Sequence, residues 1–400
     1  MQFYSTDNVP TGLERRSYAA GITRLMPNGG APLFALSGYA KKKTAVAIEH
    51  GYWSKRMIYP SCTVDGIQAI GATTLVVTDS SELVPGSILR YQKAYAGTAA
   101  VHTALAEYML VTSIVDDTHI VVQRGFQGST AAAIPDDTVL VQTGSAFEQG
   151  SNAPQTRAVA PVRNMNYTQI FRDAWDITGT LGAVQMEAGY NSVSENKGDC
   201  AAFHAQAIEK TAFFGKKGLT TYNGRPLSTM DGVESLIQQY APSQLYEAAS
   251  TTTYDQLETY LNPCFDTVTD AMNGNVRTLF VGGGALQVIN NIGRLSGTYQ
   301  IMDGQTGFGL QFKQFKTSRG TFNMIEHPIF NTNEDWKRMA VCLDLSSFDF
   351  AYLTGRDTMH QEMHTGTGKD ATGGVLTSEL TLELTNPQAC GIIYNLRAAA

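Results

Sequence analysis

Short apolar runs separated by turn residues dominate residues 61–147. The stretch "TTLVVTDSSELVPGSILRY" contains two such runs around Pro85–Gly86, and "EYMLVTSIVDDTHIVVQRGFQGST" contains two more around Asp116–Asp117. β-Branched residues without a helical period, divided by Pro, Gly and Asp, are typical of strands joined by tight turns. The pattern therefore predicts a small all-β domain at residues 61–150, inserted into the chain.

The clearest helical period lies at residues 199–214, "DCAAFHAQAIEKTAFF". Asp199 is a suitable N-cap, and Gly215 follows the last residue at a position that favours a left-handed cap. One stripe collects apolar and small side chains, namely Phe203, Ala207 and Thr211 or Ala212. The sequence predicts a single helix over this range.

Mixed elements follow in the second half of the chain. Residues 253–274 predict two consecutive helices, because Thr253 and Gln256 form a capping box and Asn262–Pro263 ends one helix and begins the next. "VRTLFVGGGALQVINNIGRL" then predicts a strand, a tight glycine turn and a helix, and "GFGLQFKQFKTSRGTFNMIEHPIF" predicts a hairpin. "KRMAVCLDL" predicts a further strand.

The last predicted strand is "VLTSELTLELT", residues 375–385. Alternation places leucines on one face and Glu379 and Glu383 on the other. Strands and helices in this order make the second half mixed α+β.

Two segments carry no strong period. Residues 1–60 hold prolines, a Gly-Gly pair and the cluster Lys41, Lys42 and Lys43, and are predicted to be irregular and extended, with a weak strand at "TAVAIEHGYW". Residues 148–190 begin with the polar linker "EQGSNAPQTRAVAP" and continue as an extended segment or a hairpin.

Charged residues make up only 16% of the 400-residue chain, which also contains 38 glycines. A surface with few charges suits lasting protein–protein contacts, since interfaces are depleted in Lys, Glu and Asp. An ordinary β-rich protein with polar loops explains the composition equally well. The net charge of −7 excludes a chain that is a basic nucleic-acid clamp as a whole, so any DNA contact is local.

The five cysteines are widely spaced and form no C-x-x-C motif. Reduced, buried thiols in a cytoplasmic protein are therefore expected, rather than a zinc site or a disulfide framework. The N-terminus lacks the apolar core of a standard signal peptide, and no run of ~18 apolar residues occurs. We expect neither standard secretion nor a membrane span.

Residues 360–374, "HQEMHTGTGKDATGG", carry the first candidate chemistry. His360 and His364 are spaced like the histidines of a zinc-protease helix. However, H-E-x-x-H has its glutamate at the second position, whereas Glu362 stands at the third position of H-Q-E-M-H. On a helix its carboxylate would point away from the two imidazoles, and the glycines that follow cannot extend that helix. Polar loop histidines are favoured over a metal site.

The same stretch contains G-T-G-K, which suggests a phosphate-binding loop. A P-loop needs G-x-x-x-x-G-K-[ST] between a buried strand and a helix. Met363 replaces the first glycine, and Asp370 replaces the hydroxyl residue that binds magnesium. The segment also leads into a strand, so nucleotide binding is disfavoured.

Three further features have weaker chemical interpretations. Residues 282–284 are three glycines after a strand, but Gln287 stands at the last position of G-x-G-x-x-G, which favours a tight turn. No G-x-S-x-G occurs, although a catalytic triad is defined by space rather than by sequence. Two readings stay open for the basic cluster, contact with phosphate backbones or a solvated turn; its members are Lys41, Lys42, Lys43 and the nearby Arg56.

A set of motifs spans most of the chain in a fixed order. "PLFALSGYAKKK" comes first, followed by R-G-F-x-G-S-T-A at Arg124–Ala131, N-x-T-Q-I-F at Asn166–Phe171 and I-T-G-T at Ile177–Thr180. "IEKTAFFGKKG", "GRPLSTMDGVESLI" and "LTLELTNPQACGIIYNL" complete the set. Together they resemble the major capsid (coat) proteins of tailed bacteriophages, in the subfamily whose coat carries a β-rich insertion in the N-terminal half.

The resemblance implies an α+β protein with the Hong Kong phage-type capsid fold, shared with herpesvirus capsids. That fold has an N-terminal arm, an extended E-loop, a peripheral domain with a long spine helix, and an axial domain. The implied ranges are the arm at 1–60, the β insertion at 61–150, the E-loop return at 151–190, the peripheral domain at 191–262, the axial domain at 263–370, and the closing strand and tail at 371–400.

The resemblance also implies a structural virion protein without catalytic, cofactor or metal sites. Such a chain assembles through hexamers and pentamers into an icosahedral shell that encloses a dsDNA genome. Implied partners are scaffolding, portal and decoration proteins and non-specifically bound packaged DNA, with no membrane, and assembly takes place in the host bacterial cytoplasm. The alternatives are another virion component, such as a tail, decoration or adhesin protein, and a metal-dependent enzyme that uses residues 360–374.

Overall fold

The chain folds into two compact units. The computed structural model describes residues 32–33, 42–55, 60–92, 106–154, 161–184, 192–248, 251–267, 275–296, 302–307, 310–363 and 370–397. Unit 1 comprises Met1–Tyr52 and Asn164–Ala400, and unit 2 comprises Trp53–Arg163. The chain leaves unit 1 along β2 (Glu49–Ser54) and returns along β9 (Val162–Tyr167), and these two strands pair with each other.

Unit 2 is a six-stranded antiparallel sheet with the order β3-β8-β5-β6-β7-β4. Its strands are β3 (Ser61–Thr63), β4 (Thr74–Val76), β5 (Ser87–Gln92), β6 (Ala106–Asp116), β7 (His119–Gln123) and β8 (Val139–Ser145). The two outer strands also meet, through a bridge between Val64 and Val77. This bridge closes the sheet into a small barrel, which removes the exposed strand edges that favour aggregation.

The interior of the barrel is a separate apolar core. Alternate residues of the strands point inward and are buried, including Val64, Leu75, Leu89, Met109, Ile120 and Leu140. The tight turn expected at Asp116–Asp117 joins β6 to β7. Unit 2 is wider than the range 61–150 expected from the sequence, because residues on both sides of that range belong to it.

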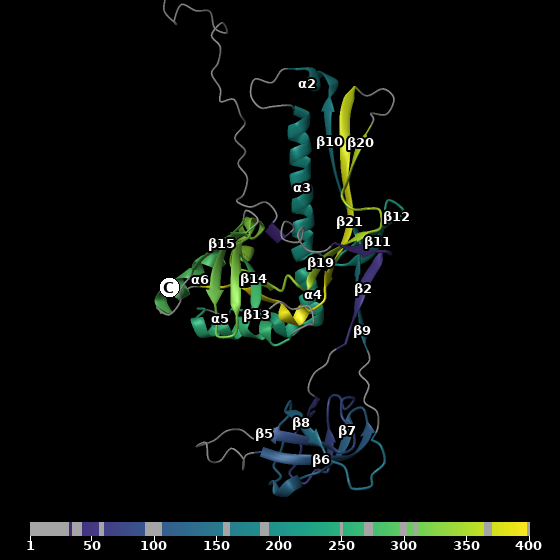
Figure 1. The fold of residues 1–400 in the computed structure, drawn as a ribbon, viewed down its shortest axis with the longest axis vertical. Coiled ribbons are helices and arrows are strands. Elements are labelled where there is room, and N and C mark those ends of the chain that lie inside the picture. The colour runs from purple at the N-terminus through teal and green to yellow at the C-terminus, as the bar shows by residue number, and fades with distance from the viewer. Residues whose placement is uncertain are drawn as a thin grey trace, which may run out of the picture. The chain divides into compact units, whose positions relative to one another are not determined.

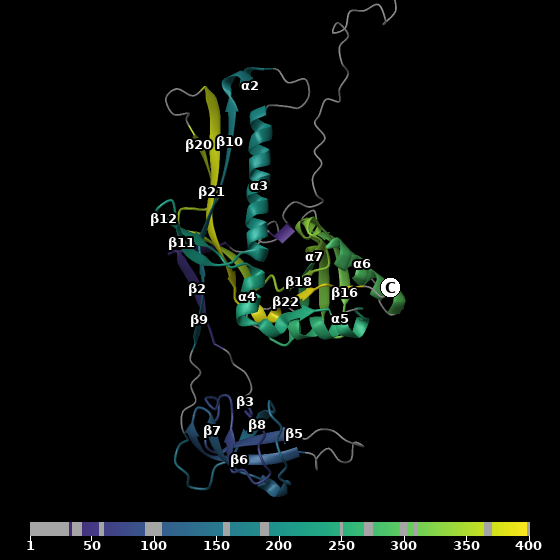
Figure 2. The same ribbon diagram turned by 180° about the vertical axis from the view of Figure 1, so that it is seen from behind.

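Unit 1 contains a five-stranded sheet beside a long helix. Its strands are β1 (Lys43–Ala45), β19 (Phe348–Leu353), β21 (Ala371–Leu384), β10 (Gln169–Thr178) and β20 (Met359–Met363). Helix α3 (Ser192–Phe214) runs along β10 and β21, as both views show (Figure 1, Figure 2). The short helix α2 (Gly179–Ala183) follows β10 and is capped by the Thr178 side chain.

Helix α3 starts at Ser192, so the expected start at Asp199 was wrong. The added turns lack an apolar period of their own. They are held by tertiary contacts instead, because Val193 packs beside Trp175 and Ile177 of β10. The helix ends before Gly215, as predicted.

The buried face of α3 also differs from the expected stripe. Phe203 is 63% exposed, whereas Cys200, His204 and Ile208 are buried. The predicted stripe was centred on the apolar Phe203, but the buried row includes His204, whose ring nitrogens have partners in the sheet. A buried polar group is tolerated when it is hydrogen-bonded.

A seven-stranded sheet forms the other part of unit 1, with the order β13-β22-β18-β14-β17-β16-β15. The strands are β13 (Leu245–Glu247), β14 (Val276–Val281), β15 (Met302–Gly307), β16 (Leu310–Lys316), β17 (Thr321–Glu326), β18 (Ala340–Leu343) and β22 (Gly391–Tyr394). Short helical elements complete this part, namely α4 (Val233–Tyr240), α7 (Glu334–Lys337), η4 (Pro242–Gln244), η6 (Pro328–Thr332) and η7 (Pro387–Ala389).

Helices α5 (Tyr254–Leu261) and α6 (Gly283–Ser296) share an apolar core with this sheet. The capping box of Thr253 and Gln256 is confirmed, as is the strand–glycine–helix unit from Val276 to Ser296. The second helix expected within 253–274 is the 3₁₀ turn η5 (Asn262–Phe265), with Pro263 in its first turn.

A second core joins the two sheets of unit 1 through α3. Ile208 and Phe213 of the helix pack with Phe280 of the seven-stranded sheet and with Leu380 and Leu382 of β21. Strand β21 is therefore buried on both faces, including the face that carries Glu379 and Glu383. The mixed α+β class expected from the sequence is confirmed.

Between α3 and α4 the chain forms an isolated hairpin of β11 (Gly218–Tyr222) and β12 (Arg225–Thr229). Asn223 and Gly224 both have positive φ, the conformation that a two-residue hairpin turn requires. No third strand pairs with this hairpin among the residues that the structure describes.

Candidate functional site

The described members of the basic cluster lie in ion pairs within the chain. Lys42 Nζ is 2.7 Å from Asp357 Oδ2 and 5.0 Å from the centroid of the Tyr352 ring. Lys43 Nζ lies 2.8 Å from both Asp349 and Glu383. The other two predicted residues, Lys41 and Arg56, lie outside the described residues.

Glu383 of β21 is the centre of a polar anchor for the N-terminal strands. Its carboxylate accepts a hydrogen bond from Lys43, the first residue of β1, and lies 2.9 Å from Nε2 of His50 in β2. Burial alone would raise the pKa of Glu383, but the hydrogen bonds from His50 and Lys43 outweigh burial and lower it. The adjacent Tyr52 donates to the carbonyl of Leu384, and burial raises the pKa of Tyr52 to about 12.

Residues 360–363 form part of strand β20 and pair with β21, so the expectation of a loop at these residues was wrong. The His360 ring stacks on the Trp175 ring with 6.0 Å between the ring centroids, and His360 Nε2 accepts a hydrogen bond from Trp175 Nε1 at 3.1 Å. Glu362 lies 3.6 Å from Lys197 of α3. His364 falls outside the described residues, and no group of three or more metal-ligating side chains occurs among those described.

A Ser–His–Asp chain lies between α3 and the sheet. His204 Nδ1 is 2.7 Å from Asp173 Oδ2, and its Nε2 is 2.8 Å from Ser378 Oγ. The order resembles a catalytic triad. However, Ser378 is fully buried in the middle of β21, and its hydroxyl donates to Thr358. The chain of hydrogen bonds therefore fastens α3 to β10 and β21.

A second buried polar contact fastens α3 to the seven-stranded sheet. Glu209 and His327 are both fully buried, and their Oε1 and Nε2 atoms are 2.7 Å apart. The same carboxylate oxygen accepts the backbone N–H of Leu33 at 2.8 Å. Glu209 thus connects α3 with the segment after β17 and with an N-terminal residue.

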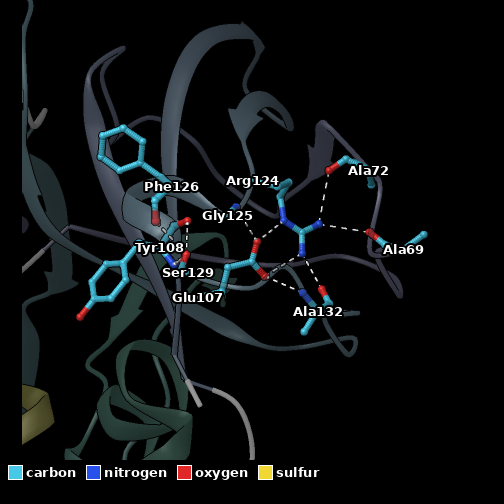
Figure 3. Close-up of polar contacts among 9 residues, drawn as sticks. All are labelled: Ala69, Ala72, Glu107, Tyr108, Arg124, Gly125, Phe126, Ser129 and Ala132. Atoms are coloured by element: carbon cyan, nitrogen blue, oxygen red, sulfur yellow. Dashed lines mark hydrogen bonds and ion pairs between the residues drawn. The ribbon is translucent and has the colours of Figure 1, made fainter. Parts of the chain in front are cut away.

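Unit 2 has one comparable anchor, drawn in Figure 3. Glu107 of β6 is fully buried and is held by Arg124, whose Nε and Nη2 lie 2.6 and 2.9 Å from the carboxylate oxygens. The backbone N–H groups of Gly125 and Ala132 donate to the same carboxylate. Burial alone would raise the pKa of Glu107, but these hydrogen bonds, led by that of Arg124, lower it.

Arg124 uses its remaining donors on the loop between β3 and β4. Its Nη1 donates to the carbonyls of Ala69 and Ala72, and its Nη2 donates to that of Ala132 (Figure 3). Ser129 of the same motif binds both backbone polar groups of Tyr108. The R-G-F-x-G-S-T motif therefore fixes the loops at one end of the barrel.

The pairing of the acidic residues in these anchors was not predicted from the sequence. Glu107 stands alone in the apolar stretch "ALAEYMLV", which is a signal of a buried charge, but Glu209 is followed by Lys210 and gives no such signal. All five cysteines are buried and unpaired, as expected, and burial raises the pKa of Cys62 and Cys390 to about 12. Within the described part of the chain, no helix is sufficiently long and apolar to span a membrane.

These anchors hold extended strands and a long helix in fixed positions. A comparison with known families identifies the class of protein. A family model described as SU10 major capsid protein matches residues 5–397. The chain belongs to this family of phage capsid proteins.

A curated relative agrees with this assignment. The chain is 34% identical over 412 residues to the major capsid protein of Pseudomonas phage PaMx41, and the match covers 99% of this chain and 96% of the relative. The shell-forming role and the virion location that the sequence suggested are those of this family. Membership of it confirms the suggested resemblance and the capsid fold that goes with it.

Among solved structures, the chain is similar to chains from phages at low identity. A chain of Mycobacterium phage Adephagia gives a TM-score of 0.47 at 8% identity, with 100% of this chain and 99% of that chain covered. A chain of the Cyanophage Pam1 capsid asymmetric unit gives 0.46 at 9% identity, with 100% of both chains covered.

Proposed function

We propose that this chain assembles through hexamers and pentamers into an icosahedral shell that encloses a dsDNA genome, and that assembly takes place in the host bacterial cytoplasm. The observation that carries the proposal is the family match over residues 5–397, together with a relative matched along nearly its whole length. A shell built from one chain needs repeated contacts between different surfaces of neighbouring copies.

The anchors of unit 1 fit this role for a physical reason. Association loses less free energy to ordering when each subunit is already rigid. Glu383, Glu209 and His204 fix the N-terminal strands, the long helix and both sheets before any contact with a neighbour forms. Weak contacts between such rigid copies add up through multivalency.

Within this proposal, the parts of the fold take the following roles. The arm takes residues 1–60, the inserted domain takes residues 61–150 within unit 2, and the E-loop return takes residues 151–190. Helix α3 is the spine helix of the peripheral domain. The elements of the seven-stranded sheet that lie within residues 263–370, together with α6, form the axial domain, and β21 with β22 closes the fold.

Scaffolding, portal and decoration proteins and packaged DNA are the partners we propose. A basic residue of the arm contacts the DNA backbone, and Lys41 is a better probe of this than its neighbours. Reversing the charge of Lys43 would break its ion pair with Glu383 and destabilise the subunit whether or not Lys43 contacts DNA. Lys41→Glu should lower the amount of packaged DNA, and unchanged packaging would exclude this contact.

Electron microscopy of the expressed chain, alone and with a scaffolding protein from the same phage, tests the central proposal. Shells, or rings of five or six subunits, are the expected result. A chain that stays monomeric at high concentration under both conditions would overturn it.

A further inference from the structure

The loop between β3 and β4 presents two apolar side chains on a rigid base. Ile67 is 79% exposed and Ile70 is 58% exposed. Between them Gln68 pairs its backbone with that of Ile134, at 2.9 and 3.0 Å. Arg124 holds the carbonyls of Ala69 and Ala72 from the other side (Figure 3). The loop is therefore fixed by hydrogen bonds to its backbone while its isoleucines are exposed to solvent.

Exposed carboxylates lie on the same loop and on the segment bonded to it. Asp65 precedes the loop, and Asp136 and Asp137 lie next to it, since Asp136 accepts the backbone N–H of Gly66 at 2.7 Å. The segments 65–72 and 134–138 contain these three acidic residues and no basic residue. We call Ile67 and Ile70 with these three carboxylates the acidic knob.

The β11–β12 hairpin has the complementary character. Leu219, Tyr222 and Leu227 are 58%, 68% and 44% exposed. Residues 216–229 contain three basic residues and no acidic one, and Lys216 and Arg225 are exposed without an ion-pair partner among the described residues. A two-stranded hairpin with apolar side chains in water is only marginally stable by itself, so it gains from being covered.

We propose that the acidic knob of one copy docks on the β11–β12 hairpin of a second copy. Both surfaces combine exposed apolar side chains with a rim of one sign of charge, and the two signs are opposite. The knob and the hairpin are different surfaces of one chain, so each copy offers both and the contact repeats from copy to copy. The rigid base of the knob lowers the cost of docking. This proposal rests on the proposed shell and names one of its contacts.

A disulfide trap tests the contact directly. Chains carrying Ile70→Cys and chains carrying Leu227→Cys are co-expressed, and the assembled particles are oxidised and run on a non-reducing gel. The native cysteines are all buried, so the background is low. Disulfide-linked pairs of the two chains are expected, at a yield severalfold above that of a matched control with Val115→Cys, whose site is also exposed in unit 2. Shells that form with a yield equal to the control overturn this contact but leave the proposed function intact.

Charge exchange gives a second and independent measure. In the trap, Arg225→Glu should reduce the yield of linked pairs severalfold, and Asp65→Arg in the partner chain should restore it. Reduction without restoration would contradict the proposed pairing of surfaces. A chain that carries both cysteines and closes the disulfide only within itself would also overturn the contact between copies. Absence of shells from the unsubstituted chain would instead overturn the proposed function.

Discussion

The two units hold their buried charges in different ways. In unit 2, Glu107 and Arg124 are 17 residues apart in the sequence. In unit 1, Lys43 and Glu383 are 340 residues apart, and His204 and Ser378 are 174 apart. Contacts between residues close in sequence form at a lower cost in chain entropy. Unit 2 can therefore complete its core locally, whereas unit 1 needs its N-terminal strands to meet its closing strand.

The largest expected effect comes from breaking the anchor of unit 2. Arg124→Ala leaves the fully buried Glu107 without its cation, and removing one partner of a buried pair typically costs ~3–5 kcal/mol. Hydrogen exchange resolved by peptide should show lost protection in residues 60–154 and unchanged protection in α3 and β21. Arg319→Ala is the matched control, since it removes an exposed ion pair with Asp266 that is worth at most about 1 kcal/mol. Equal loss of protection in both units would refute their independence.

The same difference explains how much the sequence could predict. Strands β4 to β7 of unit 2 and the turn between β6 and β7 were predicted because apolar runs and turn residues are local signals, whereas β3 and β8 were not predicted. The capping box of Thr253 was predicted because it too is a local signal. The wrong face predicted for α3 and the unpredicted burial of Glu383 share a physical cause. His204 and Glu383 are polar and are buried only because partners far away in the sequence satisfy them. A single sequence without its fold does not reveal those partners.

An intermediate effect is expected from acidifying unit 1. Glu383 has a lowered pKa in the folded chain, so its stabilising contribution is complete above the ordinary carboxyl value and is lost as pH falls through the lower, folded value. Acid should therefore release β1 and β2 from β21. Glu383→Gln should reduce the acid dependence of exchange protection in those strands. Glu107, whose pKa is also lowered, should keep its acid dependence in unit 2, which serves as the internal control. If Glu383→Gln left the unit 1 profile unaltered, the anchor would not be linked to pH.

The smallest effect separates two neighbours that look alike in the sequence. Lys42 pairs with Asp357 where both side chains are about half exposed, whereas Lys43 reaches a nearly buried Glu383. Exposed pairs are worth ~0–1 kcal/mol and are screened by salt. Lys42→Ala should therefore lower the unfolding free energy by less than about 1 kcal/mol, with a difference from the parent that shrinks in high salt. Lys43→Ala should cost more and depend less on salt, because it leaves a buried carboxylate with only His50. Urea unfolding at two salt concentrations distinguishes the two substitutions. Equal costs for both would mean that the burial of Glu383 has no energetic consequence.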